Sequence, residues 1–159
     1  MSFRITPEDP PGELYQEQEE VIDKETINTI KSGANWFIWI GALSVINSLI
    51  IYFDGNVSFL IGLAFTQIVD AFTVAIAAEG ASSFIRPLGL IFSLLIAVMF
   101  VGFGIFARSG AAWAFIFGIA LYVVDGLVFL VFGDLFAAGF HVFALIWIIR
   151  GFLLSRAIK

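Results

Sequence analysis

GAAWAFIFGIALYVVDGLVFLVFGDLFAAGFHVFALIWIIR, residues 110–150, is the stretch that decides the fold. It contains two apolar segments joined by Gly133 and Asp134, and each segment holds one polar residue of note, Asp125 or His141. About 20 apolar residues are needed to cross the hydrocarbon core of a bilayer. The stretch therefore predicts a hairpin of two membrane-spanning helices with a titratable side chain inside each.

The same apolar pattern continues through most of the chain, which is 60% hydrophobic and only 13% charged. A soluble domain has about twice this share of charged residues. The apolar runs are continuous and do not alternate as the strands of a membrane barrel do. The sequence predicts an all-α, polytopic membrane helical bundle, an integral multi-pass protein of the cell membrane that contacts the lipid bilayer. We expect about five transmembrane helices, at residues 34–53, 57–78, 84–107, 112–132 and 135–154.

The first 33 residues form an acidic N-terminal tail ahead of a transmembrane helical domain of residues 34–159. The whole net charge of −5 lies in this tail, so nucleic acid is not expected as a partner. Pro7, Pro10, Pro11 and Gly12 predict an extended start, and residues 13–32 predict a partly helical surface segment.

The residue content excludes several kinds of catalytic and metal site. The chain has no Cys and a single His, which removes disulfides, thiolate chemistry and His-rich or Cys-based metal sites. It also lacks a nucleophile elbow, a phosphate-binding glycine loop and a zinc-protease motif. We therefore expect no enzyme, no cofactor and no metal.

Polar residues inside the predicted spans are the candidate functional residues. Charged groups in hydrocarbon cost at least ~2.5 kcal/mol each on insertion scales, so Asp70 and Asp125 are expected to face the bundle interior. A carboxyl group away from water holds its proton more readily, and imidazole titrates near neutrality. The candidate proton or solute site comprises Asp70, Asp125, His141, Thr66, Gln67, Tyr122 and Asn47. The alternative is that each of them hydrogen-bonds a neighbouring helix as structural glue.

An earlier stretch, residues 33–72, partly echoes the opening one. Asn47 falls on Asp125 after a one-residue slip in the alignment, and the clearest identities are Gly33, Trp36 and Gly41, which match Gly110, Trp113 and Gly118. A true repeat would give two inverted hairpins, as in many secondary transporters, and would bring Asn47 near Asp125. Glycine and tryptophan also recur at helix entries for packing and anchoring, which is the competing interpretation.

Two functions stay open at this point. A polar seam inside the bundle favours a proton- or ion-linked transporter or channel-like protein. Small-residue faces on the second and fourth spans favour a non-catalytic membrane subunit or scaffold, with a homo-oligomer or a membrane-protein partner. Membrane orientation is not fixed, because with five spans the Lys and Arg counts at the two ends nearly cancel.

Overall fold

The computed structural model describes residues 11–55 and 62–157, and its side chains from residue 23 onward. This part of the chain is mostly helical and contains no strand, so the predicted all-α bundle is confirmed. The helices are α1 (Pro11–Tyr52), α2 (Ala64–Ala78), α3 (Ile85–Arg108), α4 (Ala112–Val131) and α5 (Leu135–Ala157).

Helix α1 runs without a break from the acidic tail into the membrane domain. Its 42 residues extend about 63 Å at 1.5 Å per residue, roughly twice the thickness of the hydrocarbon core. The expectation of an extended chain at Pro11 and Gly12 was wrong. Proline fits the first turn of a helix because its missing N–H needs no partner there. Pro7 and Pro10 lie outside the described residues.

Within residues 11–55 and 62–157, four helices are long and apolar enough to cross a membrane, and α2 is not one of them. Its 15 residues span about 22 Å, less than the ~30 Å of the hydrocarbon core. The predicted second span at residues 57–78 is therefore wrong at residues 62 and 63, which are not helical. The helix begins only at Ala64, and residues 56–61 lie outside the described part of the chain.

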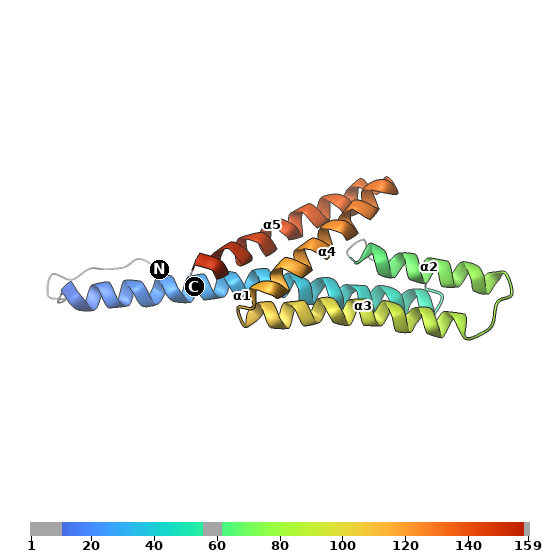
Figure 1. Ribbon diagram of the computed structural model, residues 1–159, viewed down its shortest axis with the longest axis horizontal. Coiled ribbons are helices and arrows are strands. Elements are labelled where there is room, and N and C mark those ends of the chain that lie inside the picture. Colours follow the sequence, from blue (N-terminus) through green and yellow to red (C-terminus); the bar gives the residue numbers. More distant parts are fainter. Residues whose placement is uncertain (1–10, 56–61, 158–159) are drawn as a thin grey trace.

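The start of α2 lies inside the bundle. The Leu63 amide donates a hydrogen bond to Ser44 Oγ, and Ser44 is two turns, about 12 Å, before the end of α1 at Tyr52. Farther along, Asp70 meets Ser48, so α2 runs in the same direction as α1. Figure 1 shows α2 beginning near the middle of the molecule and running past the end of α1.

This course of α2 places most cations at one end of the bundle. We call it the basic end: α3 and α5 finish there, α4 begins there, and α1 joins the other helices there (Figure 1). At the opposite end, Arg86 is accompanied by Asp54, Glu79 and Asp134. The expected near-cancellation of charges does not hold for the described residues, because α2 runs in the same direction as α1 and does not return along it. The cations of the basic end are Lys24, Lys31, Arg108, Arg150 and Arg156.

Aromatic rings and small residues form the core. Phe37 of α1 packs against Phe100 and Phe103 of α3 and against Phe115 of α4, with ring centroids 6.2–6.4 Å apart. Gly118 of α4 leaves room for the Phe37 ring, because an added Cβ would come within 2.6 Å of it. Three helices therefore converge on one buried ring, while many large apolar side chains face outward, as lipid contact requires.

The predicted turns are confirmed where they are described. Gly110 and Gly133 adopt positive φ angles of 81° and 77°, a region that glycine enters without steric cost. Asp134 Oδ1 then accepts a hydrogen bond from the Ala137 amide at 3.0 Å and caps the start of α5.

The structure does not support the inverted repeat. Helix α2 has 15 residues where its proposed counterpart α5 has 23. The helices also associate differently, since α4 and α5 pack on each other whereas α1 and α2 each pack mainly on α3.

Candidate functional site

The site is organised around the first residues of α2. Leu63 occupies the N-cap position and supplies no capping side chain, so the unpaired amides at this helix start need partners from elsewhere. Ser44 of α1 accepts the Leu63 amide at 2.9 Å. Asp125 of α4 accepts the amides of Ala64 and Phe65 at 2.9 and 3.0 Å, one on each carboxylate oxygen.

Asp125 therefore caps α2 from another helix. Its side chain is fully buried, with no exposed surface. A carboxylate at a helix N-terminus is stabilised by the hydrogen bonds and by the positive end of the helix dipole. Thr66 closes the same turn, because its hydroxyl donates to the Leu63 carbonyl at 2.8 Å.

His141 of α5 is the third part of the site. Its Nε2 lies 2.9 Å from Asp125 Oδ2, and its Nδ1 lies 2.8 Å from the Ala137 carbonyl oxygen. A carbonyl only accepts, so Nδ1 carries a proton. Neutral imidazole then has a bare Nε2, and a hydrogen bond between Nε2 and a carboxylate needs one further proton. The geometry thus requires one proton between Nε2 and Oδ2.

Aromatic side chains enclose this pair. Tyr122 stacks on the imidazole with ring centroids 4.3 Å apart and an interplanar angle of 22°, and Phe129 lies 5.1 Å away on α4. Gly126 lets α5 approach, since an added Cβ would sit 3.0 Å from His141 Cβ. Only 2% of His141 and none of Asp125 is exposed, so the pair is almost completely buried.

Asp70 forms a separate polar centre. Its two carboxylate oxygens accept hydrogen bonds from Ser48 of α1 at 2.6 Å and from Ser93 of α3 at 2.7 Å. Both Asp70 and Asp125 face the bundle interior, with 4% and 0% of their surface exposed. That prediction is confirmed. A cavity of about 10 Å³, which Arg86 also lines, adjoins Asp70 and is about the size of one water molecule.

Arg86 was not among the predicted residues. Its guanidinium donates to the carbonyl oxygens of Ile51 and Tyr52 at the end of α1, and it pairs with Asp54 at 2.8 Å. Cations stabilise the C-terminal end of a helix, so Arg86 ties α3 to the last turn of α1.

The seven predicted residues fall into three places. Asp125, His141 and Tyr122 meet directly, and Thr66 lies one turn into the helix that Asp125 caps. Asp70 lies with its two serines. The remaining two lie beside the start of α2: Asn47 is buried against Gly62, and Gln67 is half-buried in a groove between α2 and α4.

The spacing of Asp125 and His141 in the sequence already indicates that the two side chains meet. Both residues lie eight positions from Gly133, on opposite sides of the turn. In an antiparallel hairpin, positions equally far from the turn lie opposite each other. No sequence pattern predicts the hydrogen bond between Ser44 and the Leu63 amide, because Leu63 is not in α1 and follows Ser44 by 19 residues.

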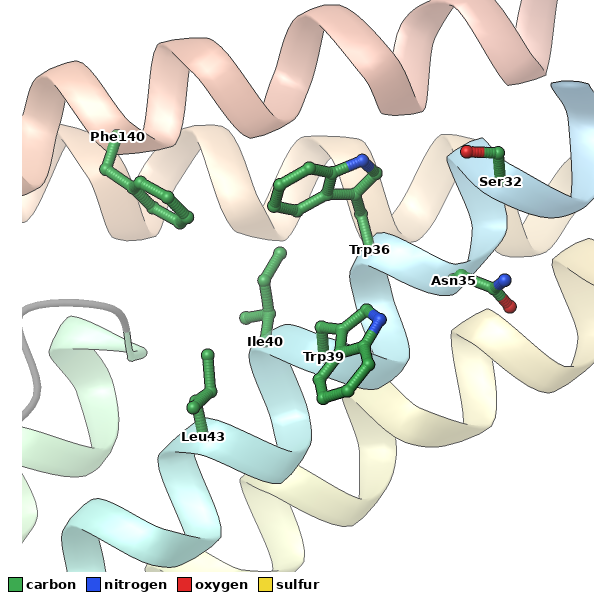
Figure 2. A pocket seen from close by; sticks show the side chains of 7 residues that line it. All are labelled: Ser32, Asn35, Trp36, Trp39, Ile40, Leu43 and Phe140. Atoms are coloured by element: carbon green, nitrogen blue, oxygen red, sulfur yellow. The ribbon is translucent and has the colours of Figure 1, made fainter.

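Three grooves open on the outer surface near the site. One, of about 360 Å³, lies between α4 and α5 and is lined by Gly126 and His141. A second, of about 670 Å³, lies between α2 and α4 and reaches Ala64, and Phe72, Phe129 and Phe132 contribute to its walls. The third, of about 550 Å³, lies between α1 and α5. Figure 2 shows Trp36 and Trp39 side by side in it, with Ser32 and Asn35 toward one end and Leu43 and Phe140 toward the other.

No group of three or more His, Cys, Asp or Glu side chains that could hold a metal ion occurs within the described residues. No family model, curated protein or solved structure matches this chain.

Proposed function

We propose that the chain is a small proton-linked membrane transporter in which the Asp125–His141 pair is the proton site. The single observation that carries the proposal is the proton required between His141 Nε2 and Asp125 Oδ2, whose heavy atoms are 2.9 Å apart. Titratable groups inside a membrane are costly and mark proton relays and substrate pathways.

Helix α2 supplies the second element that such a mechanism needs. Transporter sites are often built at helices that start within the membrane, with the helix N-terminus directed at a charged group. Here the amides of Ala64 and Phe65 bind the same carboxylate that shares the proton. A change in the protonation of Asp125 therefore changes the hydrogen bonds that hold α2 in place.

The groove between α2 and α4 lies next to this contact. It is lined by Ala64, the residue whose amide binds Asp125 Oδ2. Displacement of α2 would extend the groove toward the pair. In this proposal the described conformation is the closed one, with the proton enclosed.

A non-catalytic membrane subunit is the second candidate function. It is favoured by the complete pairing of the polar interior, since every buried side-chain nitrogen and oxygen atom among the described residues has a hydrogen-bond partner. Interhelical hydrogen bonds of this kind commonly serve as glue. In this alternative, a partner helix covers the groove between α2 and α4.

Proton flux in reconstituted vesicles tests the first candidate. The protein is placed in vesicles that contain a pH-sensitive dye, and the internal pH is followed after an external pH step. Asp125→Asn keeps the side-chain shape and removes the titrating carboxyl. Asp70→Asn is the matched control, because Asp70 is also buried but bonds only to serine hydroxyls among the contacts described.

We expect flux in the parent protein and in Asp70→Asn, and loss of flux in Asp125→Asn while the protein elutes as a folded species in detergent. Equal flux in Asp125→Asn and the parent, or no flux above empty vesicles in any of the three, contradicts the transporter proposal and leaves the subunit function.

A further inference from the structure

We propose that a pocket at the basic end, formed by Lys31 of α1 together with Arg108 and Ser109 at the end of α3, binds the phosphate group of an anionic phospholipid. The pocket has a volume of about 160 Å³, and its other lining residues are Ile27, Ile30 and Gly110. The phosphate group of a phospholipid presents anionic oxygens that accept hydrogen bonds, and paired cations with a nearby hydroxyl group suit these oxygens.

The charges of the pocket are available for a ligand. Lys31 and Arg108 are both exposed, and neither has an ion-pair partner within the described residues. Asp23 and Glu25, also on α1, lie six or more residues before Lys31 and do not line the pocket. Among the side chains that the structure describes, no carboxylate lines the pocket.

The pocket lies at the depth of lipid headgroups. Arg108 is the last residue of α3, and Trp113, in the first turn of α4, packs against Phe106 with ring centroids 5.3 Å apart. Tryptophan is enriched at the level of the headgroups. The apolar side of the pocket, formed by Ile27 and Ile30, suits the glycerol and upper acyl region of a lipid better than a fully hydrated anion.

The distribution of Lys and Arg residues between the two ends favours an anionic lipid as the ligand. Five of the six described Lys and Arg residues lie at the basic end, so the positive-inside rule makes this the cytoplasmic end. The cytoplasmic leaflet carries the anionic lipids, and basic pockets between membrane helices on that side bind their headgroups.

Native mass spectrometry of the detergent-solubilised full chain tests the proposal, with phosphatidylglycerol as the probe and phosphatidylcholine as the neutral comparison. The test variant combines Lys31→Gln and Arg108→Gln. The matched control combines Arg150→Gln and Arg156→Gln, which removes the same charge from the same end but outside the pocket. All four side chains are exposed, so both variants should fold.

We expect the parent and the control variant to bind phosphatidylglycerol equally well. We expect the pocket variant to bind it at least about tenfold more weakly, with no matching loss for phosphatidylcholine. Equal weakening in both variants would show general charge attraction and overturn the site, as would unchanged binding in the pocket variant. Displacement of the lipid by millimolar inorganic phosphate would show a site for a free anion and overturn the lipid assignment.

Discussion

Two buried carboxylates occupy this bundle in different surroundings. Asp70 accepts hydrogen bonds from two serine hydroxyls, whereas Asp125 accepts two backbone amides and faces an imidazole. The serines can turn to backbone carbonyls, and Ser93 Oγ already lies 3.3 Å from the Thr66 carbonyl. The amides at the start of α2 have no such freedom. One carboxylate therefore joins helices, and the other both fixes a helix start and shares a proton.

The largest expected difference is in stability. Asp125→Ala would leave the amides of Ala64 and Phe65 and the His141 ring without their acceptor, and breaking a buried pair costs about 3–5 kcal/mol. Asp70→Ala should lower the free energy of unfolding by only about 1–3 kcal/mol, the usual loss for unpaired neutral groups.

Denaturant unfolding in detergent, followed by tryptophan fluorescence, measures both values. A loss for Asp70→Ala that equals or exceeds that for Asp125→Ala would remove the distinction between the two centres.

A smaller loss of stability is expected when the close contact between α4 and α5 at Gly126 is disturbed. Gly126→Ala would place a Cβ 3.0 Å from His141 Cβ, and overpacking of this kind costs about 1–3 kcal/mol. Gly139→Ala is the control on α5, because nothing lies within 4 Å of its added Cβ, and it should be neutral or stabilising by up to about 1 kcal/mol. The same unfolding assay applies, and equal results for the two glycines would mean that the α4–α5 contact tolerates displacement.

The smallest effect is expected at the edge of the Asp70 region. Arg86→Gln removes the ion pair with Asp54, whose side chain is 74% exposed, and such pairs contribute about 0–1 kcal/mol. The lost bonds to the carbonyls of Ile51 and Tyr52 add to this, so we expect a total loss near 1 kcal/mol in the unfolding assay. A loss above about 3 kcal/mol would place a main stabilising contact of the bundle here instead of at Asp125.

The helical class and four of the helices could be predicted from the sequence, because long apolar runs separated by glycine-containing turns leave few alternatives. The start of α2 could not be predicted. Residues 57–78 are apolar along almost their whole length, so composition does not mark a helix start. The helix begins where Ser44 and Asp125 accept the amides of Leu63 and Ala64, which are 19 and 61 residues away from them in the sequence. The error in α2 also made the Lys and Arg counts at the two ends nearly equal, whereas five of the six described Lys and Arg residues lie at one end.

The sequence predicts which polar residues are buried better than it predicts which of them contact one another. Burial of Asp70 and Asp125 followed from the cost of charge in hydrocarbon. Their separation did not, because α2 and α4 each carry one carboxylate and hydropathy does not specify which faces meet. His141 could have been assigned to Asp125 from its position in the α4–α5 hairpin, whereas its second bond, to Ala137, depends on the rotation of the ring.

Nitrogen-15 NMR of the protein labelled only at histidine tests the shared proton most directly, since His141 is the single histidine. The account predicts that Nδ1 is protonated in both the parent and Asp125→Asn. In the parent, Nε2 either carries the proton or accepts a hydrogen bond from protonated Asp125, so its shift is displaced from that of a bare ring nitrogen. In Asp125→Asn, without the shared proton, Nε2 shows the shift of a bare ring nitrogen. An Nε2 signal that is the same in the two proteins, or an unprotonated Nδ1 in the parent, would contradict the claim that Asp125 and His141 hold one proton between them.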